Sequence, residues 1–513
     1  MIKIKGRGMK FFFKGVIILP LVLAGCSGIT DGLQHDAGQS KSDALQSYSI
    51  TIENFSPVTY TRDVEISVNP GEASEMRFSN NLSEWSAWES AAEYKEWILP
   101  ENSSMKRVYA EFRKDGAMVN SASDEIEFIE KLLPPSPGEN DKSGSSVAIS
   151  SDGLTAVVGG ENHTVTTGSG FTYRPGSVII YRYDGIRWNP AIMVPDGASD
   201  NDRFGASVSI SSDGTLIAVG SPGFSGSSGR VILYRFNTLT GGWDYVAQAA
   251  GGAGSCLGYS VALSGNGSHL LAGGVTGNSR KGEAILYSVQ TSGLSHVKTF
   301  SSLSSVAEER FGCSVSLNND ASVAVIGAEQ KANGVFTNNG AVYLFRISGA
   351  SYVETELSPG IPGYNLFFGC SVSVSDNGDV VCAGAKGASL EKGRVYLFRY
   401  NSPVYSEYIV QDDLGAAGDQ FGYSAAVSGD GEMVITGSPY ADTVYPDSGK
   451  LMLFEFNGSS YAPADEFLSS DPYNEKHLGT ASALSDSKDV FIGGAIKDIY
   501  NLKRCGTSYV FRR

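Results

Sequence analysis

A glycine motif that recurs seven times between residues 144 and 479 is the feature that most constrains how this chain can fold. In each occurrence a glycine precedes a short run of small and apolar residues, as in RFGASVSIS and FFGCSVSVS. The seven glycines are Gly144, Gly205, Gly258, Gly312, Gly369, Gly422 and Gly479. A second glycine follows 15 residues later in six units and, as Gly493, 14 residues later in the seventh. A third lies five residues before an aromatic residue in every unit, which predicts a repeat architecture.

Each unit contains four strand-like runs, which in the second unit are GASVSIS, TLIAVGS, RVILYRF and WDYVAQA. Ser-Asp-Gly and similar tight-turn sequences join the first two runs, and no segment shows the sustained 3.6-residue period of a helix. Four strands in each of seven units predict an all-β fold, a seven-bladed β-propeller with four-stranded blades over residues 134–513. A parallel β-helix is the alternative, but its coils are shorter and lack hairpin turns.

The first strand of each unit alternates apolar residues such as Val208 and Ile210 with serine or alanine. Blades taper toward the propeller axis, so an innermost strand needs one small face against its neighbour. The second strand is apolar on both faces (LIAVG, VAVIG, MVITG), as expected for a strand covered on both sides.

Two stretches carry a family resemblance, Phe204-Gly205 with Gly220-Ser221-Pro222 and Phe421-Gly422 with Gly437-Ser438-Pro439. They resemble FG-GAP repeats, the blades of the integrin α-subunit propeller and of many bacterial surface proteins, and the resemblance extends over all seven units. Integrin-type blades often hold calcium in a D-x-D-x-D-G loop, because calcium needs six to eight oxygen ligands. The corresponding turns here, such as Ser151-Asp152-Gly153, carry too few carboxylates, so we expect no metal and no cofactor.

The seventh unit reaches Arg513 after its third strand, so its fourth strand has to precede Gly144. Residues 128–133 (FIEKLL) are the candidate, although they fit equally well as the last strand of the preceding domain.

Residues 1–25 have the pattern of an export signal, with five basic residues followed by the apolar run VIILPLVLAG. That run is too short to span a bilayer. Leu23-Ala24-Gly25-Cys26 resembles the lipobox of bacterial lipoproteins, which implies cleavage before Cys26 and its lipidation; an ordinary secretory signal is the alternative. Ser27 follows Cys26, a combination that in many Gram-negative bacteria accompanies the outer membrane. The resemblance implies a protein that is lipid-anchored in the bacterial cell envelope, in the outer membrane or at the cell surface.

Residues 26–46 are polar and predict a flexible tether. Residues 47–133 alternate short strand-like runs with turn residues, which predicts a small β-sandwich, and the stretch from MRFSNN to KDGAMV resembles the Ig-like modules of bacterial surface proteins. Trp85, Trp88 and Trp97 in this module favour core packing over sugar stacking. We interpret this domain as a spacer.

Composition and motifs argue against several functions. A formal net charge of −16 argues against nucleic acid as a partner, because phosphate backbones require surplus cations. The sequence contains no G-x-S-x-G, H-E-x-x-H or G-x-x-x-x-G-K motif, and the six residues after each first glycine include no charged residue or histidine. We therefore predict no catalytic residues and no enzyme. Five cysteines besides Cys26 are an odd number, and buried free thiols are the favoured interpretation.

Because strands alternate in direction, the loops between the second and third strands and those between units emerge on one face. These loops are the long ones and carry aromatic residues and cations, which interfaces favour. The candidate ligand-binding residues are Phe171, Tyr173, Phe224, Phe336, Tyr364, Tyr440, Tyr445, Tyr473 and Tyr500. The alternative is that these rings only pack against their own loops.

The sequence thus predicts a surface-anchored lipoprotein that acts as a binding or adhesion module, held to the lipid membrane by acylated Cys26 and binding an extracellular protein or glycan. One alternative is a glycan-active hydrolase or lyase whose acidic residues lie on the loops. Another is an envelope-assembly scaffold that faces the periplasm.

Replacing Cys26 by serine should release the protein from membranes, because it removes the sulfur atom that carries the lipid. Fractionation of cells expressing Cys26→Ser checks this, with Cys505→Ser, which keeps the lipobox, as the control. A Cys26→Ser protein that still sediments with membranes would contradict the anchor.

Overall fold

The structure is a computed structural model that describes residues 48–53, 58–100, 104–166, 170–277, 281–302, 308–443, 445–469 and 475–513. The predicted signal segment, the tether with Cys26, and Tyr473 lie outside these residues. Within the described residues, no helix is long and apolar enough to cross a membrane.

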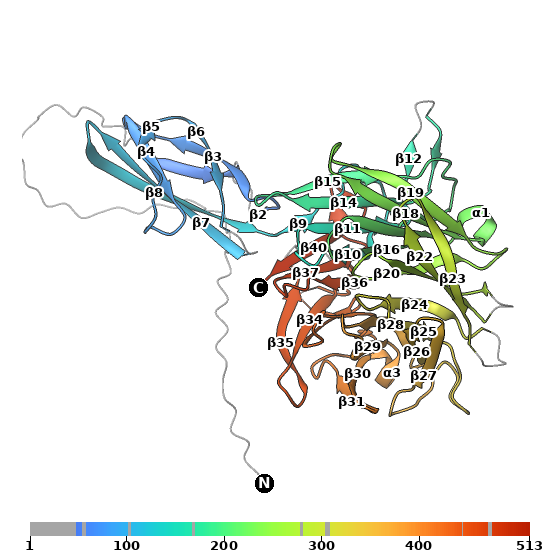
Figure 1. The fold of residues 1–513 in the computed structure, drawn as a ribbon. Coiled ribbons are helices and arrows are strands. Elements are labelled where there is room, and N and C mark those ends of the chain that lie inside the picture. Colours follow the sequence, from blue (N-terminus) through green and yellow to red (C-terminus); the bar gives the residue numbers. More distant parts are fainter. Residues whose placement is uncertain are drawn as a thin grey trace, which may run out of the picture. The chain divides into compact units, whose positions relative to one another are not determined.

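The fold is a β-propeller that follows a smaller all-β module, and the described part of the propeller contains seven four-stranded antiparallel sheets (Figure 1). We number the sheets in chain order of their innermost strands and give each from its innermost strand outward. Sheets 1 to 3 are β10 (Ser143–Ile149), β11 (Thr155–Gly160), β14 (Ser177–Tyr183) and β15 (Trp188–Met193); β16 (Ser207–Ile210), β17 (Leu216–Ser221), β18 (Arg230–Asn237) and β19 (Gly242–Ala250); and β20 (Leu257–Leu263), β21 (His269–Gly274), β22 (Glu283–Gln290) and β23 (Gly293–Phe300).

Sheets 4 to 7 are β24 (Phe311–Leu317), β25 (Val323–Ala328), β26 (Ala341–Ser348) and β27 (Ser351–Leu357); β28 (Phe368–Val374), β29 (Val380–Ala385), β30 (Arg394–Asn401) and β31 (Val404–Val410); β32 (Ser424–Val427), β33 (Met433–Ser438), β34 (Lys450–Phe456) and β35 (Tyr461–Leu468); and β36 (Leu478–Leu484), β37 (Val490–Ala495), β40 (Thr507–Arg512) and β9 (Lys131–Leu132).

The innermost strands contact one another in a closed series, since β10 touches both β16 and β36. The apolar core lies between neighbouring sheets; for example, Val342 and Leu344 of sheet 4 pack with Phe368 and Tyr396 of sheet 5. The second strands are buried on both faces, as the sequence predicts: all six residues of β17, β25, β29, β33 and β37 are buried.

The repeated glycines lie where one sheet meets the next. A Cβ atom on the second glycine of any unit would lie 2.0 or 2.1 Å from the carbonyl oxygen of the first glycine in the following sheet. In the seventh sheet this position is Gly494, whose Cβ would meet the Gly144 oxygen, and not Gly493 as the sequence comparison assigned it. The spacing of 15 residues therefore holds in all seven units, because Gly494 and not Gly493 makes the contact between sheets.

Serine residues of the innermost strands connect the sheets. The hydroxyl two residues after the first glycine donates to the next sheet's glycine carbonyl in five sheets, for example Ser146 to Gly205 at 2.9 Å and Ser424 to Gly479 at 2.9 Å. Ser209 accepts a hydrogen bond from the backbone of Leu263 in the neighbouring innermost strand. The small face predicted for these strands is thus a hydrogen-bonding face.

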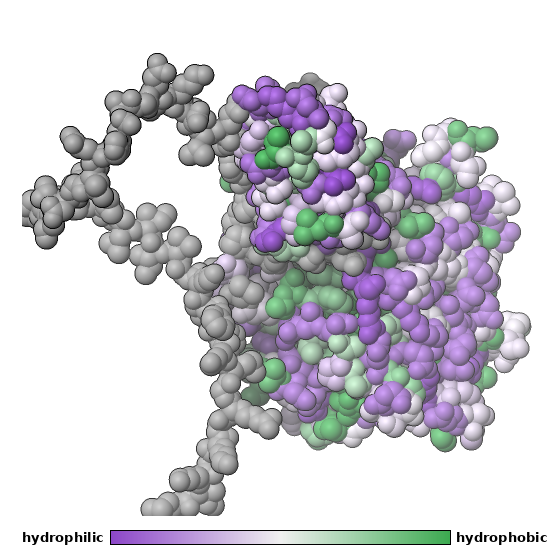
Figure 2. Space-filling model, turned by 90° about the vertical axis from the view of Figure 1, so that its left-hand side faces the viewer, coloured by the Kyte–Doolittle hydropathy of each residue, from purple (hydrophilic) through white to green (hydrophobic). Residues whose placement is uncertain are grey.

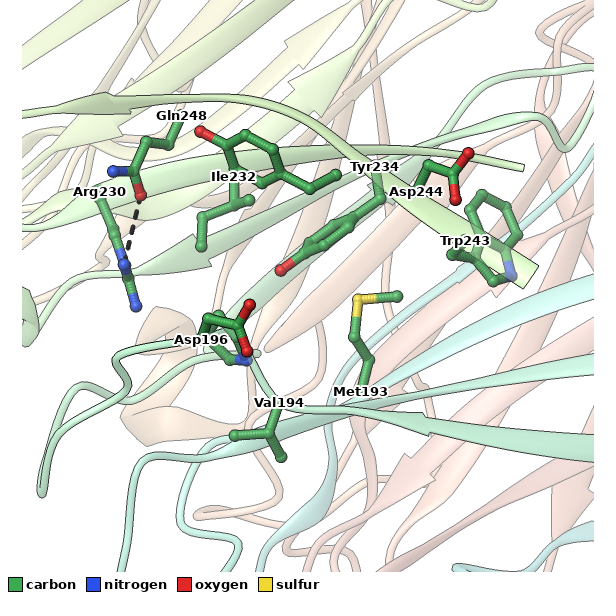
Figure 3. Close-up of a pocket in the computed structure, with 11 residues that line it drawn as sticks. Met193, Val194, Asp196, Arg230, Ile232, Tyr234, Trp243, Asp244 and Gln248 are labelled. Atoms are coloured by element: carbon green, nitrogen blue, oxygen red, sulfur yellow. Dashed lines mark hydrogen bonds between the residues drawn. The ribbon is translucent and has the colours of Figure 1, made fainter. Parts of the chain in front are cut away.

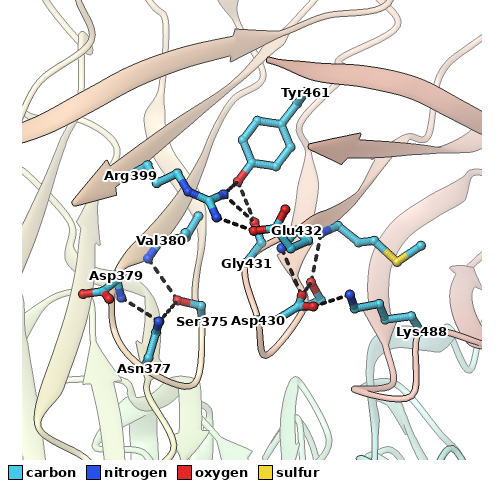
Figure 4. A network of polar contacts seen from close by, with 12 residues as sticks. Ser375, Asn377, Asp379, Val380, Arg399, Asp430, Gly431, Glu432, Tyr461 and Lys488 are labelled. Atoms are coloured by element: carbon cyan, nitrogen blue, oxygen red, sulfur yellow. Dashed lines mark hydrogen bonds and ion pairs between the residues drawn. The ribbon is translucent and has the colours of Figure 1, made fainter. Parts of the chain in front are cut away.

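The turns between the first and second strands are built by their own polar side chains (Figure 4). In Figure 4, Ser375 donates to Asn377 at 2.8 Å and accepts from the backbone of Val380 at 2.9 Å. All seven turns contain the second of these contacts, with asparagine instead of serine in sheet 4. Backbone hydrogen bonds also join neighbouring turns, such as Ser151 to Ser212. The carboxylate and amide side chains in these turns therefore form hydrogen bonds that stabilise the turns in which they lie.

The segment before the repeats completes the seventh sheet. β9 pairs with β40, Leu132 opposite Ser508 and Lys131 opposite Tyr509, whereas Phe128 ends the last strand of the preceding module. Next to this strand, Glu130 forms an ion pair with Arg512, with nitrogen–oxygen distances of 2.8 to 3.1 Å. The predicted fourth strand is therefore present, three residues before the boundary expected at residue 134.

The module before the propeller contains two sheets around one core that includes Ile66, Phe78 and Phe112. The first sheet is β1 (Ser49–Ile52), β3 (Asp63–Asn69) and β6 (Tyr94–Ile98), and the second is β2 (Val58–Thr59), β8 (Ala117–Phe128), β7 (Ser104–Lys114), β4 (Glu75–Ser79) and β5 (Glu89–Ser90). Arg77 lies over the rings of Trp85 and Trp88, at 4.7 and 4.6 Å from their centroids.

The face of the molecule in Figure 2 is mostly hydrophilic, with apolar residues in small patches.

Replacing Gly384 by alanine should lower the free energy of unfolding by about 3 kcal/mol or more, because the new methyl group would overlap the Gly422 carbonyl at 2.0 Å. Gly293→Ala is the matched control, since nothing lies within 4 Å of a Cβ at that strand position. Thermal unfolding of both variants measures the effect, and equal melting temperatures would contradict the role of the glycine contact.

Candidate functional site

The loops between the second and third strands carry extra local structure, as the alternation of strand directions predicts for one loop-rich face. They contain two hairpins, β12 (Val165–Thr166) with β13 (Thr172–Tyr173) and β38 (Ile499–Tyr500) with β39 (Lys503–Arg504). They also contain the single helical turns α1 (Phe224–Ser227) and α3 (Ala388–Glu391). The tight turns that join the first and second strands lie at the opposite end of the sheets.

A strained turn precedes each innermost strand on the loop-rich face. The residue two positions before the first glycine has a φ between 53 and 58° in all seven sheets, although none of these residues is glycine. Its carbonyl accepts a hydrogen bond from the residue three positions later, as Arg310 does from Cys313 at 3.0 Å. The seven residues are Lys142, Arg203, Cys256, Arg310, Phe367, Gln420 and His477. Strain of this kind persists where the surrounding structure fixes the backbone, and it places seven different side chains at equivalent positions.

Side chains from these turns and the neighbouring loops form one polar cluster across sheets 3 to 5. Arg310 donates to the hydroxyl of Tyr259 at 2.6 Å and lies 3.4 Å from the carboxylate of Glu329. Lys386 binds the other oxygen of Glu329 at 3.0 Å. A buried carboxylate thus lies between two cations, one from its own sheet and one from the next.

Aromatic rings continue the cluster toward sheet 7. The Lys386 ammonium lies 5.6 Å from the ring centroid of Phe367 and 5.3 Å from that of Tyr423. Tyr423 packs edge-on against Tyr440, and Tyr440 packs on His477 with centroids 4.7 Å apart. We call this set the axial cluster; its members are Tyr259, Arg310, Glu329, Phe367, Lys386, Tyr423, Tyr440 and His477.

The protonation states of the cluster follow from burial and neighbouring charges. Burial, together with the nearby charge of Lys497, lowers the pKa of His477 to about 4, so the imidazole is neutral at pH 7. Burial raises the pKa of Tyr423, as it does the pKa of the neighbouring thiols of Cys313 and Cys370. The cluster therefore presents two cations, one carboxylate and neutral aromatic groups.

A second, smaller arrangement of the same kind lies across sheets 1 and 2. Glu161 is bound by Lys142 at 2.8 Å and by Arg203 at 2.5 Å. These two cations, together with hydrogen bonds from them, lower the pKa of Glu161 although its burial acts in the opposite direction. The loop-rich face thus carries two pairs of cations, each pair around one carboxylate.

This arrangement fits binding better than acid–base chemistry. General acids need a raised pKa, whereas Glu161 is held ionised. Glu329 also lies between two cations and has no carboxylate partner in the axial cluster.

Among the described residues, no group of three His, Cys, Asp or Glu side chains is arranged to hold a metal ion. The five described cysteines are free, and Cys313, Cys382 and Cys505 are buried, as the sequence interpretation favours.

The structure divides the candidate aromatic residues into small groups. Phe171 stacks on Tyr173 with centroids 6.3 Å apart, and Phe336 packs edge-on against Tyr364 at 5.1 Å. Among the candidates, Tyr440 belongs to the axial cluster. Together these residues form no single aromatic surface.

The remaining candidates lie apart from these pairs. Phe224 covers the guanidinium of Arg230 at 4.0 Å, Tyr500 belongs to the hairpin strand β38, and Tyr445 lies half-buried in its loop. Tyr473 lies outside the described residues.

Sequence reasoning missed most of the axial cluster, because it searched the innermost strands for charge and, although the loops carry aromatic residues and cations, chose only aromatic residues as candidates. Arg310, Glu329 and Phe367 lie immediately beside the repeated glycines. The sequence feature that could have identified this cluster is the variable residue two positions before the first glycine of each regular unit. That residue is lysine or arginine in three units and another residue type in the other four.

Comparison with known proteins is informative for one repeat. Residues 305–345 match the family model described as FG-GAP repeat. A search of the curated proteins found no match to this chain. Among solved structures, the chain is similar to the crystal structure of the RRP9 WD40 repeats, with 12% identity and a TM-score of 0.47, over 75% of this chain and 97% of that one.

Because His477 is neutral in the folded protein, lowering the pH from 6.5 to 4 should destabilise the protein through this residue. The unfolded chain takes up a proton near pH 6.5 and the folded chain only near pH 4, so stability present above pH 6.5 is lost across this window. The loss attributable to His477 should be roughly 1–3 kcal/mol.

Melting temperatures of the native protein and His477→Gln across this pH range test this prediction, with exposed His296→Gln as the control. A His477→Gln variant that loses as much stability on acidification as the native protein would contradict it.

Proposed function

We propose that this protein is a non-enzymatic binding or adhesion module that recognises an extracellular protein or glycan through its loop-rich face. The axial cluster is the observation that carries this proposal. It gathers two cations and four aromatic side chains, and the ion-paired Glu329 lies between the two cations. Tyrosine and arginine are enriched at the energetic centres of interfaces, where side chains held rigidly lose little entropy on binding.

The scaffold explains why this face is suited to recognition. Tyr259 of the cluster lies in β20, and the other side chains start from turns or loops that are anchored by the contacts between neighbouring sheets, such as Gly340 against Phe368. The framework can therefore stay constant while the residues beside the glycines vary. Loops on a rigid scaffold are the usual location of binding residues.

The finer architecture belongs to the same proposal. We infer that the seven sheets are the blades of one seven-bladed FG-GAP-type propeller, and that the module of residues 47–133 is an Ig-like spacer. The lipobox-like Leu23-Ala24-Gly25-Cys26 supports lipid anchoring in a bacterial envelope, with residues 26–46 as the tether. The binding face would then be displayed at a distance from the lipid surface.

Changing Phe336 and Tyr364 to alanine together with Lys386 to alanine should abolish capture of a partner from envelope extracts or a glycan array. The three changes remove an aromatic pair, of which Tyr364 is exposed and Phe336 half-buried, and one cation of the axial cluster. Val404→Ala, at the exposed first residue of the fourth strand of sheet 5, is the control.

Melting temperatures of all variants exclude unfolding as the cause of lost capture. Capture that survives the triple change in a folded protein would overturn the proposal. Glycan cleavage by the native protein would instead establish the enzyme alternative, and resistance of the propeller to protease on whole cells would favour the periplasmic scaffold.

A further inference from the structure

The most deeply buried ion pair among the described residues lies where sheet 7 is completed. The Nζ atom of Lys131 in β9 is 2.7 Å from the Oδ2 atom of Asp498, and the two side chains are 1% and 0% exposed. Asp498 lies in the connection between β37 and β38, close to the end of the chain. The pair therefore joins the segment that precedes the repeats to the last unit of the propeller.

Other buried cations of the propeller differ from Lys131 in their chemistry. Arg230, which Figure 3 shows among the residues around a cavity of about 540 Å³, faces Asp202 at 3.5 Å. Its guanidinium stays protonated in proteins and is no nucleophile. Lys450 donates to Glu466 at 2.7 Å, and the Glu466 side chain is 46% exposed, so solvent reaches this ion pair. Lys131 is instead a primary amine held against a carboxylate that water does not reach.

Aromatic rings surround the amine of Lys131. The ring centroids of Tyr60 and Tyr509 each lie 4.9 Å from its Nζ atom. Burying a pair of opposite charges removes their hydration, and transfer of one proton from the ammonium to the carboxylate leaves both groups neutral. A desolvated, uncharged lysine amine is a nucleophile, and here its target is the adjoining carboxyl group.

The carboxyl group of Asp498 is held as a target for such an attack. Its Oδ2 atom accepts hydrogen bonds from the Thr507 hydroxyl at 2.5 Å and from the Tyr509 hydroxyl at 2.9 Å. Its Oδ1 atom accepts one from the backbone of Ile499 at 2.8 Å. Two donors on one oxygen stabilise the negative charge that develops there when a nucleophile adds to the carboxyl carbon. Both reactants are fixed in contact, which lowers the entropic cost of the reaction.

A second buried lysine fixes the direction of these hydrogen bonds. Lys476 is fully buried and has only donors, so the Ser469 hydroxyl accepts from it and donates to the Tyr509 oxygen at 3.0 Å. The hydroxyl hydrogen of Tyr509 is therefore directed to Asp498. This chain of donors begins at a cation and ends on the carboxyl oxygen, which it polarises.

We propose that Lys131 and Asp498 become joined by an amide bond within the folded protein. The nitrogen of Lys131 bonds to the carboxyl carbon of Asp498, and the bond between that carbon and Oδ1 breaks. One of the three ammonium hydrogens stays on the amide nitrogen, and the other two leave with Oδ1 as water, so the step needs no oxidant, reductant or cofactor. The bond fastens β9 covalently to sheet 7, and it is independent of the function proposed for the loop-rich face.

Peptide mapping of the purified full-length protein by mass spectrometry tests this proposal. Trypsin does not cleave after a lysine whose amine is acylated, so residues 115–142 should appear joined to residues 498–503. The mass of the joined peptide should be lower than the sum of its two parts by one molecule of water. An unlinked chain instead gives residues 115–131, 132–142 and 498–503 as separate peptides. Separate peptides alone, from a folded native protein, would overturn the proposal.

Two matched variants assign the bond to its residues. Lys131→Arg keeps a positive charge beside Asp498 but has no nucleophilic amine, so the joined peptide should be lost. Lys450→Arg makes the same change in another buried ion pair and should leave the joined peptide at its native amount. Loss of one water from residues 498–503 that persists in Lys131→Arg would show dehydration without a cross-link and overturn the proposal.

Thr507→Val follows the reaction without altering either reactant. It removes one of the two donors to Oδ2, so the joined peptide should form roughly a hundredfold more slowly in newly synthesised protein. If Lys131→Arg fails to fold, the peptide map of the native protein still decides, because it needs no variant.

Discussion

The close approach of a glycine to a backbone carbonyl of the next sheet is the contact on which the rest of this structure depends. At Gly159, Gly220 and their equivalents the space for a side chain is already occupied by the neighbouring sheet's backbone. No other residue permits that distance, so the glycine register fixes how closely the sheets pack. The apolar clusters between sheets, such as that around Phe368, form at the separation which these contacts define.

The same contacts account for the geometry of the loop-rich face. The glycine that begins each innermost strand has a φ between 83 and 98°, and the residue two positions before it is also left-handed. Together these two residues turn the chain at the start of the innermost strand, and they direct one side chain per sheet toward the loop-rich face. Side chains as different as Arg310, Phe367 and His477 occupy this position without a change in the backbone around it. The side chain can vary at this position while the packing between sheets stays the same.

The fold was predictable from the sequence because its main constraint is local and repeated. Glycine spacing, strand alternation and turn residues each indicated the same four-stranded unit. Counting what the last unit lacked pointed to residues 128–133, which fitted the preceding domain equally well, and the structure places the strand at Lys131–Leu132. The placement of Gly493 failed by one residue because adjacent glycines are indistinguishable in sequence, and only the contact with Gly144 separates them.

The candidate site was less predictable, because Arg310, Glu329 and Lys386 come from different sheets and meet only when the sheets assemble.

The strand β9 also sets a time order for assembly. Glu130 and Arg512 are 382 positions apart, so a chain made from its amino end presents Lys131–Leu132 long before β40 exists to receive it. Until then the early strand has an unsatisfied edge, and sheet 7 stays incomplete whatever the state of the sheets in between. During synthesis, sheet 7 can be completed only after β40 has left the ribosome, and a ribosome that stalls before residue 507 leaves this sheet without its third strand.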